Sequence, residues 1–494
     1  MNPNSPAPGK PGTPLFTAPP LKRDPYAALK YPGYRRFVFS TFLFSLFRQG
    51  LVVAIAWQVY QWTHSAAAIG FIGFVNVVPL LLFVLPAGVL ADRVDRRKII
   101  FVTMGLSFLL SVLLVLCTQF HDSIPGDTGL LQSANKFIYA AALFFTSEKE
   151  RANIHFDNLA LPIVFFLQFL HSTVRVIGNP ARAALIPQLV PQNVIPNAFI
   201  LNSTAFELSA TIGPPVGGLI AGLTIPFAAY QVTGFSIIYG LDAFFSALVA
   251  LAFIGIKLNP VEGEDRASAS SSPATTDVSA PTSPGALAGV SFIWQHKPVL
   301  AAITLDLFAV LLGGVVALYP IFADTILITQ FFSSPTVNGL LRASLPFGAS
   351  VMALIVVHLP PFKRPGIVLL WTVLGFGAST LVFALSKNIF LSLAALFVSG
   401  MFDNVSVVIR HTLVQMSTPN LLRGRVSSVN QLFIGSSNEI SEFRGGMMAA
   451  RFGARAAAAI GAVSILLVVG GVGALFPSLR KVPPLHELKP AEEK

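Results

Sequence analysis

The sequence predicts an all-α membrane protein of about twelve transmembrane helices, arranged as two six-helix bundles. The first observation is composition: of 494 residues, 54% are hydrophobic and 11% are charged, and the mean hydropathy is +0.71. Soluble domains carry about 25% charged residues, and so few charges cannot cover this much apolar surface in water. The second is a series of apolar runs of membrane-spanning length, and the third is a polar segment that divides this series in two.

The apolar runs account for the predicted helices. A transmembrane helix needs about 20 mainly apolar residues. Pro79 and Pro86 fall within one run, where neighbouring helices of a bundle can satisfy the freed backbone groups. The predicted spans are 37–62, 67–91, 99–119, 159–178, 197–222 and 228–256 in the first half, and 299–325, 337–358, 365–386, 388–411, 427–449 and 456–477 in the second.

The polar segments predict the domain organisation. Residues 258–286 are rich in Ser, Ala and Pro without periodicity, as is typical of a flexible linker. Residues 1–35 hold several prolines and no apolar core, so we expect a disordered cytoplasmic tail and no signal peptide. In the outer loop 120–158, the apolar run Lys136–Thr146 is too short to span and is expected to form an interfacial or packed surface helix. The predicted units are a tail (1–35), a first bundle (36–257), the linker (258–286), a second bundle (287–478) and a cytoplasmic tail (479–494).

The distribution of cations predicts the orientation. The formal net charge is +11, but the cations lie in short loops between apolar runs, which argues against nucleic acid as a partner. Lys and Arg number about 17 on one side, with Arg175, Arg182 and Arg410 counted as loop residues, against about 6 on the other. The positive-inside rule then predicts a multi-pass protein of the inner membrane with both termini in the cytoplasm.

An internal repeat supports the division into two bundles. One fixed offset carries the loop after span four, with the helix that follows it, onto the corresponding segment after span ten. Parallel repeats of this kind are found in transporters built from two similar halves. The matched residues are Arg182 with Arg410, Leu185 with Leu413, Pro191 with Pro419, Asn202 with Asn430, and Gly217-Gly218 with Gly445-Gly446.

The most informative local motif is the charged run Gly88–Lys98 between the second and third spans. Gly88 permits close helix approach there, and Asp92 can cap or pair with a neighbouring helix end. The pattern Gly-x-x-x-Asp-Arg-x-x-Arg-Arg resembles the loop between helices two and three of the major facilitator superfamily of secondary transporters. In that superfamily the loop is thought to latch the two halves in one access state.

This resemblance implies a set of gating residues. The superfamily usually has Gly where this chain has Asp95, so the tight-turn glycine of the pattern is missing. The alternative is a plain positive-inside loop without a gating role. The candidate gating residues are Gly88, Asp92, Arg93, Asp95, Arg96 and Arg97.

A second motif lies in the fifth span and reads Gly-Pro-Pro-Val-Gly-Gly over Gly213–Gly218. Proline bends a helix, and paired glycines let another helix pack closely. The run resembles the Gly-Pro-x-x-Gly-Gly core of the antiporter branch of the superfamily, although Ser209 stands where that signature has a further glycine. The alternative is an ordinary kinked and tightly packed helix. The candidate helix-bend residues are Gly213, Pro214, Gly217 and Gly218.

Further segments are similar to the enterobactin-exporter-like branch of the superfamily. They are Asn179–Pro191 after span four, Ser441–Gly446 in span eleven, and Arg48–Gly50 with Trp57–Tyr60 in span one. The resemblance implies efflux of a drug or siderophore by an antiporter. Gln168 is near the place where many antiporters carry an arginine in span four, so the usual proton-coupling scheme does not transfer directly.

Ionisable side chains inside the spans are the candidate site residues. They are costly in a membrane and usually face a cavity or a partner. A desolvated carboxyl group also has a raised pKa and can exchange protons near neutral pH. The alternative is a structural ion pair or a snorkelling side chain, with Arg342 and Arg444 as counter-ions; His171 is expected to be satisfied by a neighbour. The candidates for substrate or proton coupling are Arg48, Glu207, Asp242, Asp306, Asp403, Glu439 and Glu442.

These features predict a secondary active transporter that works by alternating access. We expect proton-coupled export of an amphipathic small molecule, such as a siderophore or drug-like compound, by a monomer in the lipid bilayer. The sequence has no ATP-binding glycine-rich loop, metal-ligand spacing or hydrolase motif, so we expect no cofactor, no metal and no enzymatic activity. Two alternatives stay open: a facilitator or importer of a lysolipid or metabolite with the same fold, and a non-transporting membrane sensor.

Overall fold

The computed structural model describes residues 24–124, 129–227, 230–253, 288–358, 360, 362–419 and 422–484. Over these ranges the fold is all-α except for one antiparallel hairpin, β1 (Thr224–Phe227) paired with β2 (Tyr230–Thr233). All the predicted spans correspond to long helices. They are α1 (Pro32–Thr63), α2 (Ala66–Arg93), α3 (Arg96–Gln119), α6 (Leu161–Leu189), α7 (Ile195–Ala221) and α8 (Gly234–Ala252), then α11 (Lys297–Gly313), α13 (Ser334–Val356), α14 (Pro365–Leu385), α15 (Ile389–Ser417), α16 (Arg423–Phe452) and α17 (Ala454–Leu475).

Within the described residues, 10 helices are long and apolar enough to cross a membrane. One of these spans begins with α11 and continues through η4 (Val316–Leu318), α12 (Tyr319–Ile321) and η5 (Phe322–Ile326). The long helices α7 and α16 are not among these ten. Both are less apolar than the others and carry acids, Glu207 in α7 and Glu439 in α16. A helix packed between other helices does not need an apolar surface all round, so we assign α7 and α16 to the membrane as well.

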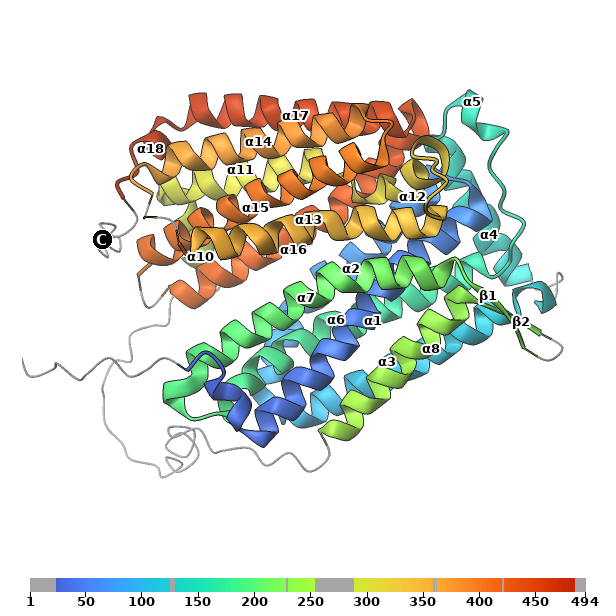
Figure 1. Cartoon of the computed structure of the whole chain (residues 1–494), viewed down its shortest axis with the longest axis horizontal. Helices are drawn as coiled ribbons and strands as arrows, with labels where there is room; N and C mark the ends of the chain where they lie inside the picture. Colours follow the sequence, from blue (N-terminus) through green and yellow to red (C-terminus); the bar gives the residue numbers. More distant parts are fainter. Residues whose placement is uncertain are drawn as a thin grey trace, which may run out of the picture.

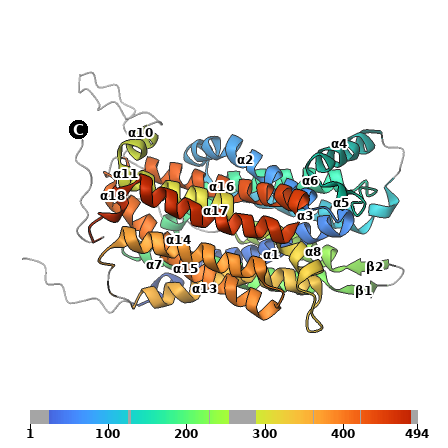
Figure 2. The ribbon, with the colours of Figure 1, turned by 90° about the horizontal axis from the view of Figure 1, so that it is seen from above.

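The helices form two bundles side by side (Figure 1). The first contains α1, α2, α3, α6, α7 and α8, and the second contains α11 and α13–α17. The bundles meet along two helix pairs, α2 with α16 and α7 with α13. We call one end of the molecule the termini face, because η1 (Ala27–Lys30), α10 (Ala288–Gln295) and α18 (Pro477–Arg480) lie there. The hairpin, α4 (Gly129–Phe145) and α5 (Glu148–Arg151) mark the opposite face (Figure 2).

The repeated glycine pairs bring the bundles together near the opposite face. Gly218 of α7 lies against Gly339 of α13, and Gly446 of α16 lies against Gly70 of α2, so closely that a Cβ at either position would collide with backbone. The first glycine of each pair packs within its own bundle, Gly217 against Gly50 of α1 and Gly445 against Gly314. Equivalent residues therefore make equivalent contacts in the two halves, as the internal repeat predicts.

The hydrophobic core continues across this junction. The largest cluster of buried residues includes Trp57 and Ile72 from the first bundle and Tyr319, Phe322 and Met447 from the second. Smaller clusters fill the individual bundles nearer the termini face. Among the described residues, the two bundles therefore share a packed apolar core in the half of the molecule nearer the opposite face.

The structure bears on the segments that were predicted to lie outside the spans. The predicted disordered tail is wrong from residue 24 onward, because the backbone N–H of Ala28 donates to Asn197 Oδ1 at 2.9 Å and the buried Tyr34 donates to the Ala198 carbonyl at 2.6 Å. Residues 1–23, the linker 258–286 and the last residues 485–494 lie outside the described ranges. The short apolar run is a surface helix, as expected: α4 packs on α2, α6 and α16 and leaves Phe137 and Phe144 more than three-quarters exposed.

Candidate functional site

A cavity of about 570 Å³ lies between the two bundles and is lined mainly by the helix halves nearer the termini face. Most of its lining comes from α1, α2, α3, α6 and α7 of the first bundle, and the second bundle contributes Arg342 of α13 with Glu439 and Glu442 of α16. Its volume falls in the range of about 300–1,000 Å³ that is usual for small-molecule sites. The aromatic lining residues are Phe37, Phe44, Phe199 and Phe206, and the charged ones are Arg48, Arg175, Arg182, Arg342, Glu439 and Glu442.

Arg48 belongs to a buried polar cluster behind the cavity wall. Its Nη2 lies 3.1 Å from Oδ2 of the fully buried Asp242, and its Nη1 lies 2.8 Å from Nδ1 of His171. Ser111 Oγ lies 3.3 Å from His171 Nε2 and donates to Asp242 Oδ2 at 2.6 Å. The cluster joins α1, α3, α6 and α8, so it fixes the Arg48 side chain at the cavity edge. His171 is satisfied by its neighbours, as expected.

Two further ion pairs cross the cavity or line it. Arg175 Nη2 of α6 lies 2.9 Å from Glu439 Oε1 of α16, so this pair joins the two bundles. Arg342 of α13 lies 3.6 Å from Glu442 of α16 within the second bundle. Glu439 is 15% exposed and Arg175 is 44% exposed, so water reaches the pair from the cavity. A pair of this kind can change partners as the bundles move.

The remaining predicted acids lie elsewhere. Asp306 of α11 forms an ion pair with the buried Arg410 of α15, inside the second bundle and outside the cavity lining. Glu207 of α7 and Asp403 of α15 come from different bundles and are not among the cavity-lining residues. Of the seven candidates, the structure therefore brings Arg48, Glu439 and Glu442 to the cavity and places Asp242 directly behind Arg48.

Arg175 and Arg182 were placed in a loop by sequence analysis, and this is wrong. Helix α6 continues to Leu189, past Pro180 and Pro187, so both arginines lie within it and line the cavity. Arg410 is likewise inside α15 and is 3% exposed.

The expected counter-ion role of Arg444 is also wrong, since its guanidinium donates to the Leu311 carbonyl at 2.8 Å and contacts Met448. Arg342 is confirmed as a counter-ion.

The charged loop Gly88–Lys98 makes its described contacts within the first bundle. Asp95, in place of the usual glycine, caps α3 by accepting from the backbone N–H of Arg97 at 2.9 Å. Arg96 donates to the Ala184 carbonyl of α6 at 3.4 Å. Gly88 does not mediate close helix approach here, because a Cβ on it would meet nothing within 4 Å. The side chain of Asp92 lies outside what the structure describes.

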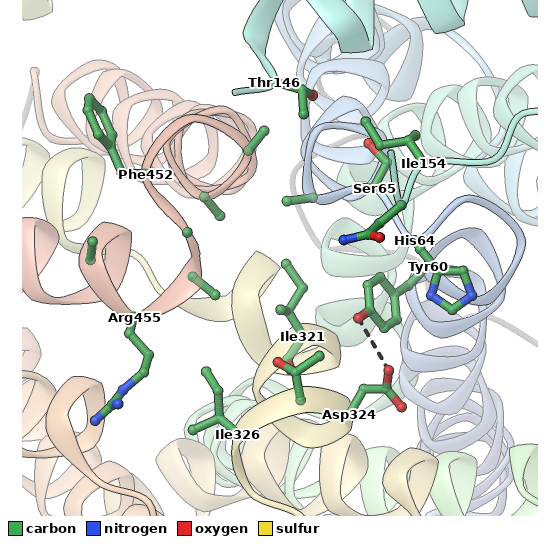
Figure 3. A pocket seen from close by; sticks show the side chains of 18 of the residues that line it. Tyr60, His64, Ser65, Thr146, Ile154, Ile321, Asp324, Ile326, Phe452 and Arg455 are labelled. Carbon is green, nitrogen blue, oxygen red and sulfur yellow. Dashed lines mark hydrogen bonds between the residues drawn. The ribbon is translucent and has the colours of Figure 1, made fainter. Parts of the chain in front are cut away.

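A second pocket of about 770 Å³ lies between the bundles at the opposite face. In it, the hydroxyl of Tyr60 from α1 donates to Oδ2 of Asp324 from η5 at 3.3 Å, and this hydrogen bond joins the bundles (Figure 3). Asp324 was missed by sequence analysis, although an acid at the end of the seventh apolar run was a signal for it. The described residues hold no group of three His, Cys, Asp or Glu side chains that could bind a metal.

Comparison with known proteins identifies similar chains. The family model described as Major Facilitator Superfamily matches residues 37–440. The enterobactin exporter EntS of Shigella boydii serotype 18 is 24% identical over 400 residues, which is 81% of each chain. The enterobactin exporter EntS of Escherichia coli O1:K1 / APEC is 23% identical over the same share of both chains.

Solved structures show the same fold at low identity. An inward-facing, occupied bacterial homologue of the human lysosomal transporter Spinster has a TM-score of 0.64 and 12% identity, covering 93% of this chain and 99% of its own. A D-xylose–proton symporter has a TM-score of 0.61 and 12% identity, with coverage of 89% and 97%. An inward-facing bacterial homologue of the iron transporter ferroportin has a TM-score of 0.59 and 13% identity, with coverage of 91% and 99%.

Proposed function

The chain belongs to the Major Facilitator Superfamily, and from that membership we propose that it is a proton-coupled exporter of an amphipathic small molecule in the inner membrane. Membership makes it a multi-pass membrane transporter and not an enzyme. Export as the direction is supported by the relatives, which are enterobactin exporters. The substrate class is a siderophore or a drug-like compound.

One observation carries the proposal. The cavity is lined mainly by the helix halves nearer the termini face, while the glycine contacts and the shared core pack the bundles together between this cavity and the pocket at the opposite face. This is the geometry of one access state in an alternating-access cycle, in which the two bundles rock about a central site. A membrane sensor that does not transport has no need of such a cavity with ionisable groups from both bundles.

The orientation follows from the loop charges. With Arg175, Arg182 and Arg410 placed inside helices, Lys and Arg still gather mainly at the termini face, as in Arg93, Arg96 and Arg97. The positive-inside rule therefore puts the termini face in the cytoplasm. The structure then corresponds to a cytoplasm-open state, in which an exporter takes up its substrate.

Proton coupling is proposed for the acids that contact arginines. Glu439, Glu442 and Asp242 each lie within ion-pair distance of an arginine that lines the cavity. Protonation of such an acid releases its arginine, so proton binding and substrate binding can be linked through the same side chains. Asp306, Glu207 and Asp403 are proposed as further coupling residues, because movement of the bundles would change their surroundings.

The two sequence motifs are proposed to act when the access state changes. In the cytoplasm-open state, the loop Gly88–Lys98 contacts its own bundle. We propose that Asp92, Arg93, Asp95, Arg96 and Arg97 contact the second bundle once the cytoplasmic side closes. The helix-bend residues Gly213, Pro214, Gly217 and Gly218 allow α7 to pack against α1 and α13, which closes the opposite face.

Transport into inverted membrane vesicles tests the function. Enterobactin and the amphipathic dye 8-anilinonaphthalene-1-sulfonate are offered to inverted vesicles with an acidic lumen. Both are expected to accumulate, and a protonophore or Glu442→Gln is expected to abolish accumulation. Asp122→Asn removes an acid that is 92% exposed at the opposite face and serves as the matched control. Flux that ignores the gradient would contradict proton coupling, and flux that runs only outward from the lumen would favour an importer.

A further inference from the structure

We propose that the central cavity binds an acidic aromatic compound whose anionic group is held by Arg182. This inference rests on the proposed function in one respect, namely that this cavity is the substrate site. It adds the chemical class of the ligand and the residue that selects it. Two features of the cavity support it: the way its charged side chains are paired, and the aromatic side chains that lie beside Arg182.

Arg182 is the arginine of the cavity without an acidic partner. Arg48, Arg175 and Arg342 each pair with a carboxylate. Among the residues that the structure describes, Arg182 forms no ion pair; its Nη2 donates to Asn179 Oδ1 at 2.6 Å. The guanidinium groups of Arg48 and Arg182 both lie against the ring of Phe44, so this part of the cavity holds more than one positive charge. A cluster of like charges in a membrane-embedded cavity is unfavourable, and a bound anion relieves it.

The carboxylates of the cavity are already engaged, so a cationic ligand has no comparable site. Glu439 and Glu442 both lie against arginines, and Asp242 is fully buried behind Arg48. An anion, by contrast, can accept two parallel N–H bonds from the planar guanidinium of Arg182.

The surroundings of Arg182 suit an aromatic body on the ligand. The guanidinium of Arg182 lies 5.5 Å from the ring centroid of Phe44, and that of Arg48 lies 5.2 Å from the same ring. Phe44 therefore holds both cations in place from one side. Phe199 and Phe206, also in the cavity lining, are 41% and 54% exposed and offer ring faces to a ligand. The volume of about 570 Å³ accommodates a compound of two or more fused rings.

Binding of a matched pair of small probes tests this inference. 1-Naphthaleneacetate and 1-naphthaleneacetamide share ring and shape but differ in charge. Each is equilibrated by dialysis with the purified full chain in detergent. We expect the wild-type protein to bind the acid about tenfold more tightly than the amide, since a charge-assisted bidentate contact contributes about 1.5 kcal/mol or more. Arg182→Ala should remove the preference, and Arg182→Lys should keep only part of it.

The controls separate this inference from the proposed function. Lys387→Ala removes a cation that is exposed at the opposite face and should leave the preference unchanged. If Arg182→Ala does not fold, Arg182→Gln takes its place, with a thermal melt to confirm folding. Equal binding of acid and amide, or a preference that survives loss of Arg182, overturns the inference while the vesicle result stands. Failure of both probes to bind also overturns it. A preference for the acid in a chain that transports nothing keeps the inference and removes the proposed function.

Discussion

Arg175 of α6 and Glu439 of α16 form an ion pair, 2.9 Å between Nη2 and Oε1, that connects the two bundles across the cavity. The pair lies in the cavity, on the termini side of the glycine contacts. It is therefore a contact between the bundles in the part of the molecule where the cavity separates them. Because both side chains are reached by water, the pair contributes modestly to stability but directly to the balance between access states.

Removing this pair is expected to change the population of the cytoplasm-open state. Arg175→Ala or Glu439→Gln should each raise the free energy of that state relative to the others by up to about 1 kcal/mol, so its population relative to theirs should fall by up to about fivefold. The double variant should add nothing to either single change, because both remove one interaction. Spin-label distances between the bundles at the termini face measure the populations; additive effects in the double variant would speak against a direct pair.

Gly218 is expected to tolerate no side chain. Gly218→Ala places a Cβ against the Pro335 carbonyl and Gly339. The state in which the bundles are closed at the opposite face should therefore become less stable by about 1–3 kcal/mol. Gly470→Ala in α17 is the matched control, since a Cβ there meets nothing within 4 Å. The readout is the rate at which a cysteine in the opposite-face pocket reacts with a water-soluble maleimide. Equal rates in the two variants would refute the role of Gly218.

Asp242 is expected to be structural for the first bundle. Asp242→Asn leaves the Arg48 guanidinium without the charge that balances it, which should destabilise the protein by about 3 kcal/mol or more. Adding Arg48→Met should recover much of the loss, because the unpaired cation is then gone. Thermal melts in detergent measure both changes. Full stability in Asp242→Asn alone would show that the cluster is hydrated and not a buried network.

The hydrogen bond between Tyr60 and Asp324 is expected to hold the opposite face closed. Tyr60→Phe removes the hydroxyl and keeps the ring, so the state that is closed at the opposite face should become less stable by about 0.5–1.5 kcal/mol. Maleimide labelling of a cysteine at Ile321, which lines the same pocket, should become several-fold faster. Asp324→Asn should have a smaller effect because its amide oxygen still accepts the hydrogen bond. Unchanged labelling in Tyr60→Phe would exclude a gating role for this contact.

Most of the fold could be predicted from the sequence, because lipid imposes a simple rule on length and hydropathy. Eleven of the twelve predicted spans became single long helices, including α7 and α16, and the seventh became α11 followed by the short segments η4, α12 and η5. The ends of α6 could not be predicted. Pro180 and Pro187 indicate a boundary in water, but here the helix continues through both of them.

The candidate site could be predicted only in part, because sequence does not show which face of a helix a charge occupies. Arg48, Glu439 and Glu442 were identified from the cost of burying a charge and do line the cavity. Arg182 was assigned to a loop because the predicted span ends at residue 178, and Arg175, near the end of that span, was counted with the loop cations. Partners such as Asp306 with Arg410 are distant in sequence and become evident only from the packing of α11 on α15.

Alternating access is the central claim, and paired spin-label distances test it most directly. In a Cys117→Ala background, one pair of labels at Val94 and Gly424 reports the termini face, and another at Gln61 and Ile328 reports the opposite face; all four positions are exposed. A change of pH or added substrate should shift the equilibrium between access states. We predict that the distance at the termini face then shortens in the same fraction of molecules in which the distance at the opposite face lengthens. Two distances that stay fixed, or that lengthen together, would contradict the claim.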